Sequence, residues 1–284
     1  MRGRFQKAML LTALVAVPSS VQAGWVSQWS NIATQPSGER AAPQSSSMTI
    51  AGNRVRLEQP EAITLIDYNT GTFTVMNPTK QVFWSGPIDE YARLVAESRT
   101  NAMLKKFNEF QDKKNAAHGL PPATVGLKKI DPAKLPPLSI LKTDVTERIA
   151  GYDTIKYQVQ VDGELFQELW IAPTLDVSSD LNIDRYLTQQ RKIGAGMAGK
   201  SADQYNALYL NDDYRQLLEK AFVLKMVTHH IAGGFERTAT SVNQADVAAS
   251  QFEVPDTYRK VRLSDVLPSP PTTQPQPPSK PKGS

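Results

Sequence analysis

No cysteine occurs among the 284 residues of the sequence, and only three are histidine. The absence of cysteine excludes disulfide bonds, thiol nucleophiles, cysteine-bound zinc or iron–sulfur clusters, and a lipidated N-terminal cysteine. Glycine, with 16 residues, shows no regular period, which excludes a collagen-like chain. A hydrophobic content of 40% is too high for a wholly disordered protein, so the length suits one large domain or two small ones.

Long apolar runs are also missing. The run at residues 8–17 covers ten positions, whereas about 20 are needed to cross a bilayer. Three basic residues precede this run, and a small-x-small pattern at residues 21–23 follows it. This order is typical of a secretory signal peptide at residues 1–23 rather than of an uncleaved anchor. We expect cleavage between Ala23 and Gly24 and a periplasmic location.

The chain lacks a strong excess of one charge. It carries 32 basic and 28 acidic residues, and the signal contains three of the basic and none of the acidic ones, which leaves 29 basic against 28 acidic residues. A nucleic-acid-binding protein needs a basic face. The nearly neutral mature chain therefore predicts no nucleic-acid partner.

Residues 48–267 have the pattern of a single α+β domain, which follows a loose segment at 24–47 rich in Ser, Gln, Pro and Ala. Runs of β-branched and aromatic residues alternate with polar ones, and turn pairs such as Gly52-Asn53 and Asp162-Gly163 separate them. This spacing predicts hairpins and an antiparallel sheet. The expected strands lie at 48–57, 63–68, 72–76, 81–84, 141–150, 155–161, 165–172, 221–228 and 236–247.

Apolar residues at helical spacing predict helices at 87–110, 184–193 and 203–220. A proline-rich insertion at 115–138 predicts a linker or a long surface loop within the domain. The proline-dense residues 268–284 predict an extended, disordered tail. Two readings of this tail remain: a passive extension, or a docking strip for an envelope protein.

One motif resembles a nucleotide-binding loop. Residues 194–201 match the pattern G-x-x-x-x-G-K-S, which cradles phosphates when a buried strand leads into it and a helix follows. The preceding residues 185–192 are polar and predicted to be helical. We therefore interpret 194–201 as a flexible joint between two helices and expect no nucleotide.

The histidines give no metal-binding pattern. His118 lies in the proline-rich insertion, and His229 and His230 are neighbours at a strand end, so their side chains point to opposite faces. We expect both to be solvated. No G-x-S-x-G motif supports a serine nucleophile. The sequence thus predicts no cofactor, no metal and no catalytic residues.

Aromatic residues stand on the expected strands, and two interpretations of them remain open. They either fill the core between sheet and helices or line a cavity that binds an acyl chain or a similar apolar ligand. The candidate ligand-lining residues are Phe73, Trp84, Tyr157, Trp170 and Phe222.

Three parts of the chain carry a family resemblance: Met48–Leu57 with Ile63–Asn69 and the turn Asn77–Lys80; Arg148–Val159 with Glu168–Ala172; and Phe252–Lys260. Together they resemble an exported bacterial family known as domain of unknown function 4412, over roughly residues 48–260. That family is similar in architecture to Lol-type periplasmic lipoprotein carriers and their mycobacterial lipid-binding relatives. The insertion at 115–138 and the tail depart from its pattern.

The resemblance implies a strongly curved antiparallel sheet, an incomplete barrel, with helices covering its concave side. It implies no catalytic residues. We expect a non-enzymatic periplasmic protein that binds a lipid, an acyl chain or a lipidated partner such as a lipoprotein within the curved sheet. The alternative is a cell-envelope interaction or scaffold module with a filled core. The oligomeric state is left open.

Overall fold

The computed structural model describes residues 21–35, 37–95, 97, 135–195, 200–219, 222–230 and 233–267. The expected signal up to residue 20, His118, most of the proline-rich insertion and the tail at 268–284 lie outside these described residues. Nothing in the described helices is both long enough and apolar enough to cross a membrane.

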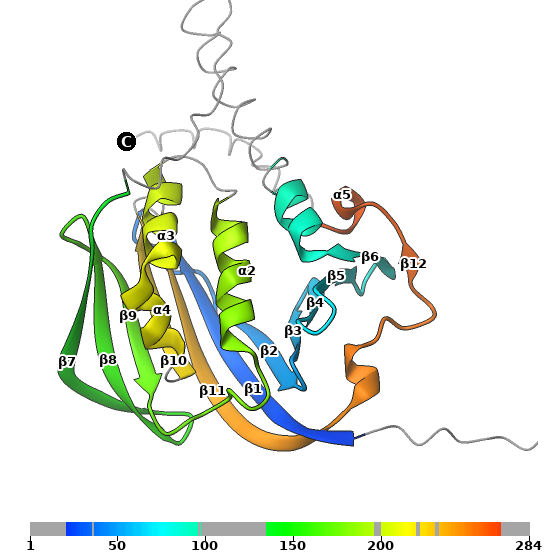
Figure 1. The fold of residues 1–284 in the computed structure, drawn as a ribbon, viewed down its shortest axis with the longest axis horizontal. Coiled ribbons are helices and arrows are strands. Elements are labelled where there is room, and N and C mark those ends of the chain that lie inside the picture. Colours follow the sequence, from blue (N-terminus) through cyan, green and yellow to red (C-terminus); the bar gives the residue numbers. More distant parts are fainter. Residues whose placement is uncertain are drawn as a thin grey trace, which may run out of the picture.

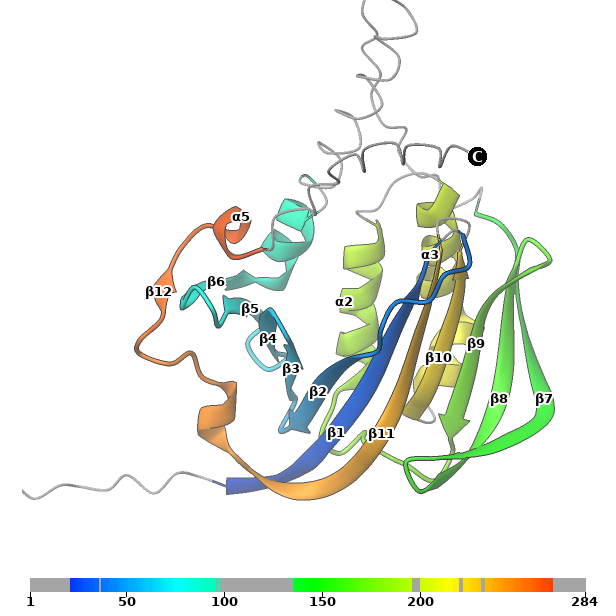
Figure 2. The ribbon, with the colours of Figure 1, turned by 180° about the vertical axis from the view of Figure 1, so that it is seen from behind.

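A single sheet of 12 strands runs through the described residues, in the order β12-β6-β5-β4-β3-β2-β1-β11-β10-β9-β8-β7 (Figure 1). The neighbouring strands pair antiparallel, except that β12 pairs parallel with β6. The sheet is strongly bent but open, with β12 and β7 as its two edges (Figure 2). The strands are β1 (Val21–Thr34), β2 (Gln44–Ala51), β3 (Arg54–Gln59), β4 (Ala62–Asp67), β5 (Thr72–Asn77), β6 (Val82–Pro87), β7 (Leu138–Ile149), β8 (Tyr152–Val161), β9 (Glu164–Ala172), β10 (Phe222–His230), β11 (Gly233–Ala248) and β12 (Arg259–Lys260).

Two-residue turns connect the hairpins as the sequence predicts. Gly52 and Asn53 have φ of 55° and 61°, and Asp162 and Gly163 have φ of 56° and 77°. A pair of positive φ angles matches the right-handed twist of the flanking strands, which is why Gly, Asn and Asp are favoured there. The strands β2–β3 and β8–β9 are therefore in the register that their alternating side chains require.

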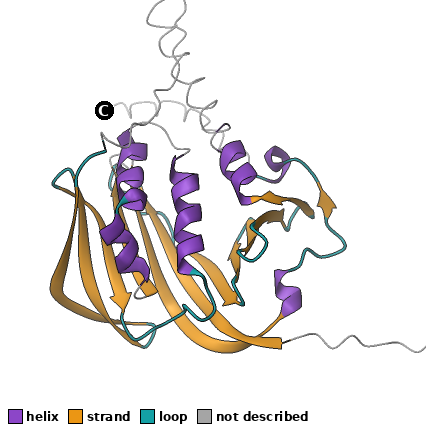
Figure 3. Ribbon diagram, in the orientation of Figure 1, coloured by secondary structure: helices purple, strands orange, loops and turns teal. Residues whose placement is uncertain are grey.

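Helices cover one face of the sheet, and strands make up most of the fold (Figure 3). A helix at residues 88–95 follows β6 directly. The others are α2 (Ile183–Ala195), α3 (Lys200–Leu210), α4 (Asp212–Glu219) and α5 (Leu263–Val266), with a short 3-10 turn, η2, at Ala249–Phe252. The structure confirms the predicted α+β architecture: a bent, open sheet that is mostly antiparallel, with helices on its concave side (Figure 1).

The helix expected at 203–220 is divided in two. Asn211 lies between α3 and α4, and its side-chain oxygen accepts a hydrogen bond from the backbone N–H of Tyr214, 2.9 Å away. An asparagine in this capping position starts a new helix. The apolar stripe continues across the break, so periodicity alone did not reveal it.

The expectation of a loose segment at 24–47 was wrong. Most of it forms β1 and the start of β2, and β1 lies in the interior of the sheet between β2 and β11. Trp25 and Trp29 are buried, and the Trp29 indole N–H donates to the Ser27 hydroxyl at 2.8 Å. The polar composition suggested a loop, but hydrogen bonds satisfy these buried polar groups, which makes them compatible with a central strand.

Two hydrophobic clusters form the interior. The larger one joins residues of β1 to β7 and of β9 to β11 with the helix at 88–95, α2 and α5. The smaller one joins β8, β9 and β10 with α3 and α4. Each helix thus buries its apolar side against the concave face of the sheet. Helix α2 packs against the larger cluster and also contacts α3.

Candidate functional site

A cleft of about 430 Å³ opens between α2, the β4–β5 turn and the start of the helix at 88–95. It is lined by residues 68–71, residues 87–89, and Asp184, Arg185, Thr188 and Gln189 of α2. This volume falls within the range of ordinary small-molecule sites, roughly 300–1,000 Å³. The cleft is therefore the natural place to look for a ligand.

Local hydrogen bonds hold the β4–β5 turn in place. The Asp67 carboxylate accepts from the backbone N–H of Asn69 at 2.8 Å, and the Asn69 amide donates to the Gly52 carbonyl oxygen at 2.9 Å. Gly71 has a φ of 70°, a conformation that glycine adopts without strain. Its carbonyl oxygen accepts from the N–H of Ile88 at 3.0 Å, which ties the turn to the following helix.

The start of α2 is fastened to the same region. Asn182 caps the helix by accepting from the N–H of Arg185 at 2.9 Å, and its own N–H donates to the Asn53 side chain at 2.7 Å. The Arg185 guanidinium donates to the Tyr68 carbonyl oxygen. These bonds join α2 to the β2–β3 turn and to the end of β4, so both walls of the cleft are fixed.

Two neutral polar side chains in the cleft are buried and unpartnered. Gln189 is 2% exposed, and neither its amide nitrogen nor its amide oxygen has a hydrogen-bond partner. Tyr68 is 3% exposed, and its hydroxyl also has none. Burying each of these groups without a hydrogen-bond partner costs about 1–3 kcal/mol of free energy.

Tyr68 forms the inner end of the cleft. Burial, with a smaller contribution from Tyr186, raises the pKa of the Tyr68 phenol far above its usual range, so it stays a neutral hydroxyl. Its ring meets that of Tyr186 edge to face, with 6.5 Å between the ring centres. Tyr68 belongs to the larger hydrophobic cluster, which therefore begins immediately behind the cleft.

The charged side chains around the cleft already have partners. Asp184 lies 3.2 Å from an Nη of Arg215, and Arg185 is bonded to the Tyr68 carbonyl. Asp89 is likewise engaged within the described chain. The partner of the Arg185 guanidinium is a neutral carbonyl oxygen, so this contact leaves its positive charge without an opposite charge.

Phe73 and Trp84, two of the five candidate ligand-lining residues, lie together under the helix at 88–95. The Phe73 ring stacks on that of Tyr91 with 3.9 Å between ring centres, and the Trp84 ring centre is 6.0 Å from that of Tyr91. Both belong to the larger cluster, near the cleft but behind its lining residues. They pack against aromatic neighbours rather than forming a wall of the cleft.

Of the other three candidates, Trp170 belongs to the larger cluster, Phe222 packs against it, and Tyr157 packs against the smaller one. Phe222 is half-buried, with its ring centre 6.1 Å from that of Trp29, and Tyr157 packs against the smaller cluster. Trp170 pairs in register with Lys156 and Lys225, and both ammonium groups lie over its ring, at 5.0 and 4.4 Å from its centre. Four of the five candidates thus belong to or pack against the larger cluster, and none of the five lines the cleft.

Trp170 also faces away from α3. Its neighbours Leu169 and Ile171 pack with Leu208 of α3, and side chains alternate along a strand. Trp170 and the two lysines thus lie on the opposite, outer face. The strict alternation of β8, which pairs with β9, was visible in the sequence, but which face of the sheet the helices cover was not.

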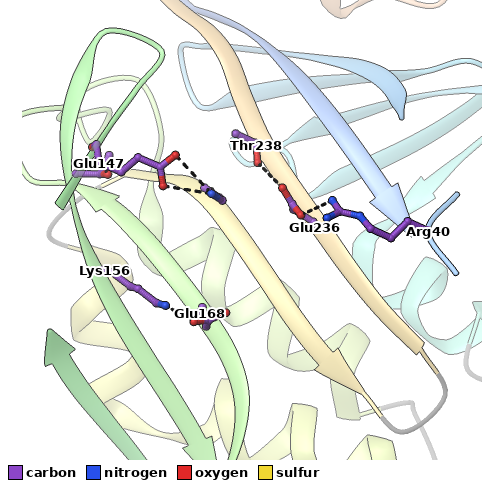
Figure 4. A network of polar contacts seen from close by, with 8 residues as sticks. Arg40, Glu147, Lys156, Glu168, Glu236 and Thr238 are labelled. Atoms are coloured by element: carbon purple, nitrogen blue, oxygen red, sulfur yellow. Dashed lines mark hydrogen bonds and ion pairs between the residues drawn. The ribbon is translucent and has the colours of Figure 1, made fainter. Parts of the chain in front are cut away.

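Ion pairs link the strands on this outer face (Figure 4). Lys156 pairs with Glu168, and Lys225 lies 3.2 Å from Glu147. His229, which we expected to be merely solvated, has its Nε2 3.0 Å from an Oε of Glu168. Burial opposes ionisation of Glu168, but hydrogen bonds from Lys156 and His229 outweigh it and lower the pKa of that carboxyl.

No group of three or more histidine and acidic side chains gathers within the residues that the structure describes. Around the motif at 194–201, α2 ends at Ala195 and α3 begins at Lys200, while residues 196–199 lie outside the described part. A helix and not a strand leads into the motif. The expectation that helices precede and follow the motif is confirmed.

Sequence reasoning missed Tyr68 and Gln189. Tyr68 ends a run of β-branched residues and resembles any other strand-end aromatic residue. Gln189 is adjacent to Gln190 in a polar helix, and nothing in a single sequence shows which of the two is buried. Only the contacts of α2 with the β4–β5 turn distinguish them.

No family model matches the chain, and no curated protein matches it either. The resemblance to family 4412 therefore stays a prediction.

Several solved structures are similar in backbone arrangement. A structure of PNGF-II in space group P21 is 11% identical with a TM-score of 0.34, and the match covers 84% of this chain and 31% of that one. The MucA/MucB complex of Pseudomonas aeruginosa is 12% identical with a TM-score of 0.34, covering 84% and 58%. A Vibrio parahaemolyticus domain described as an outer membrane lipoprotein-sorting protein is 8% identical with a TM-score of 0.31, covering 81% and 88%. The chain spans about a third of the length of PNGF-II.

Proposed function

We propose that this chain is an exported, non-enzymatic protein of the bacterial envelope that binds the apolar part of a lipid or of a lipidated partner. The ligand enters the cleft between α2 and the β4–β5 turn, on the helix-covered side of the curved sheet. The observation that carries the proposal is the cleft itself, with its volume of about 430 Å³ and its position at the edge of the larger hydrophobic cluster.

The lining supports a ligand with a large apolar part. Pro87, Ile88 and the ring of Tyr68 line the cleft, and Ile88 packs directly against the larger cluster. Apolar walls with a few polar groups are what small-molecule sites commonly present. An acyl chain placed here would bury its methylene groups, each worth about 0.8 kcal/mol.

Export is supported by the signal pattern at residues 1–23. Residues 21–23 belong to β1, and Gly24 pairs with Ala245 of β11. Cleavage after Ala23 would shorten β1 by three residues at its beginning and leave Trp25 and Trp29 in place. N-terminal sequencing of protein recovered from the periplasmic fraction tests this: a mature chain that begins at Gly24 is expected, and an intact Met1 would contradict it.

The binding proposal is tested by mass spectrometry of organic extracts from the purified full-length protein. We expect co-purifying acyl-containing molecules. Thr188→Trp places a large ring in the cleft from the exposed side of α2 and should lose them. Thr146→Trp, on the exposed part of β7 away from the cleft, is the matched control and should retain them. Extracts without acyl species, from protein that also takes up none on incubation, would overturn the proposal.

A scaffold module is the second candidate, and the edge strand β7 favours it. Leu141 and Val145 on this strand are 55% and 50% exposed, and β7 has a neighbour on one side only. Exposed apolar residues on a free strand edge are a common basis for pairing with another chain.

The tail is the second surface that a scaffold module could use. If a docking strip for an envelope protein lies in the tail, deletion of residues 268–284 should abolish partner capture. Unchanged capture would count against that role.

A further inference from the structure

A second pocket, of about 310 Å³, lies where β1 ends and β2 begins. It shares no lining residue with the cleft beside α2. The turn between β3 and β4 and the beginning of β11 complete its walls. Its volume also falls within the range of small-molecule sites, roughly 300–1,000 Å³.

One aromatic ring in this pocket is open to solvent. Phe235 is 39% exposed and belongs to neither hydrophobic cluster. Phenylalanine is usually buried, because full burial of its side chain stabilises a protein by about 1.5–3 kcal/mol. The pocket therefore offers a ligand a flat apolar face.

The strand register places polar side chains beside this ring. Ala33 of β1 pairs with Phe235. Asn31, two residues earlier on β1, pairs with Gln44 of β2. Paired residues share a face of the sheet, as do residues two apart on one strand. Asn31, Gln44 and Phe235 therefore form one row across β2, β1 and β11.

The polar side chains of the pocket are accessible to a ligand. Gln44, Gln59 and Glu61 are exposed, and within the described chain their side chains have no hydrogen-bond or ion-pair partner. The Asn31 amide nitrogen donates to the Gln44 carbonyl oxygen at 3.1 Å and to the Ser46 hydroxyl at 2.8 Å. These bonds fix the Asn31 amide at the wall, while the other three side chains remain available.

This combination of groups matches the surface of a pyranose sugar. The rim of a pyranose carries neighbouring hydroxyl groups, each a donor and an acceptor, and an amide or a carboxylate can bond two of them at once. The faces of the sugar ring carry C–H groups, which pack on an aromatic ring. An acyl chain, in contrast, would desolvate the amides and the carboxylate without giving them a partner.

The charge of the lining favours a neutral sugar. Glu61 is the one ionisable residue of the described lining, and its carboxylate can accept hydrogen bonds from hydroxyl groups. The guanidinium of Arg237 on β11 lies over the Trp29 ring and is not part of the lining. An anionic sugar would therefore meet the Glu61 carboxylate with no cation in the lining to compensate for its desolvation.

We propose that this pocket binds a neutral pyranose sugar that stacks on the ring of Phe235. Gln44, Gln59 and Glu61 bond its hydroxyl groups. This inference goes beyond the proposed lipid binding and does not depend on it, because the two sites share no residue. Thr188→Trp, which fills the cleft, should therefore leave sugar binding unchanged.

Ligand-detected NMR and calorimetric titration of the full-length protein test this with lactose, maltose and N,N′-diacetylchitobiose as probes. The wild type should bind at least one of them, with magnetisation transferred most strongly to the C–H protons of the stacked sugar ring. Phe235→Ala should weaken the binding of that probe about tenfold, whereas Phe235→Tyr keeps the ring and should retain it. Leu141→Ala, at another exposed apolar residue, is the matched control and should leave the affinity unchanged.

A second pair of variants tests the polar contacts. Gln59→Ala removes an exposed amide of the pocket and should weaken the same probe about fivefold. Gln28→Ala removes an exposed amide of β1 that does not line the pocket, and it should leave the affinity unchanged.

The outcomes that would overturn the proposal are distinct from those that concern the cleft. Failure of the wild type to bind any of the three sugars would overturn it, as would binding that survives in Phe235→Ala. Methyl glucuronide or N-acetylglycinamide binding more tightly than every neutral sugar would show that an anionic sugar or a peptide is recognised instead. Each of these results leaves lipid binding in the cleft unaffected.

Discussion

The guanidinium of Arg237 lies over the indole ring of Trp29, with 4.1 Å between its central carbon and the ring centre. Arg237 stands on β11 and Trp29 on β1, and the pair is on the helix-covered face near Tyr186 of α2. Burial lowers the pKa of Arg237, although Tyr186 opposes the shift. Within the described residues, no acid forms an ion pair with it, and its Nε has no hydrogen-bond partner. The Trp29 ring thus partly compensates a half-buried cation.

This arrangement predicts that Arg237→Met does not destabilise the fold. Methionine keeps the apolar stem and removes a desolvated charge, so we expect the free energy of unfolding to rise by about 1 kcal/mol. Chemical denaturation measures it. Arg40→Met is the control, because Arg40 is an exposed residue paired with Glu236, and should change stability by less than about 0.5 kcal/mol. A loss of more than about 1 kcal/mol in Arg237→Met would show that the cation–π contact dominates.

Gln189→Leu should make the ligand-free protein more stable. The substitution removes two buried polar atoms that have no partner, and leucine occupies a similar volume. We expect a gain of about 1 kcal/mol in the free energy of unfolding, measured by urea denaturation of delipidated protein. Gln190→Leu should produce less than half of this gain. A destabilised Gln189→Leu would indicate that the amide supports the fold.

The lowered pKa of Glu168 predicts that its contribution to stability depends on pH. Its pKa in the folded protein is lowered, so it stabilises the fold above the unfolded value of about 4.3, and this contribution is lost as the pH falls through the folded value. Glu168→Gln should therefore lower the free energy of unfolding at pH 7 by about 1 kcal/mol and have a smaller effect near pH 3. Denaturation at both values compares it with Glu164→Gln, an exposed residue of the same strand. An equal loss at both pH values would contradict the assignment.

Gly24→Ala should destabilise the central strand pair. A Cβ at this position would lie 2.5 Å from the Ile50 carbonyl oxygen and 2.7 Å from the Ala51 Cβ. Backbone and a short side chain cannot move aside easily, so we expect a loss of about 1–3 kcal/mol. Thermal unfolding of the isolated protein measures it. Gly151→Ala meets no atom within 4 Å and isolates the effect of a positive φ, so an equal or smaller loss in Gly24→Ala would contradict the steric explanation.

Much of the sheet could be predicted from local patterns. The turn pairs at Gly52-Asn53 and Asp162-Gly163 require backbone conformations that few residues adopt, and alternating side chains on the flanking strands set the register. The strand β1 could not be recognised in the same way. The Ser27 hydroxyl donates to the Met48 carbonyl oxygen of β2 and accepts from the Trp29 indole N–H, which a single sequence does not display.

The candidate site, in contrast to the sheet, could not be predicted from local sequence patterns. Its lining joins residues 68–71, 87–89 and 184–189, which become neighbours only when α2 packs across the β4–β5 turn. The aromatic residues Phe73 and Trp84 were conspicuous in the sequence but pack behind that lining, and Trp170 faces the other side of the sheet. Residue type alone did not distinguish a core aromatic residue from a ligand-lining one.

The amino-acid sequence by itself determined the absence of thiol chemistry, the export pattern, the hairpins and the helical segments, because each of these depends on neighbours within a few positions along the chain. Only the tertiary structure decided which face the helices cover, where a cleft remains between them and the sheet, and that Gln189 and Tyr68 are buried there without partners. These features depend on long-range packing, since burial and hydrogen bonding are properties of surfaces that meet and not of residues in order.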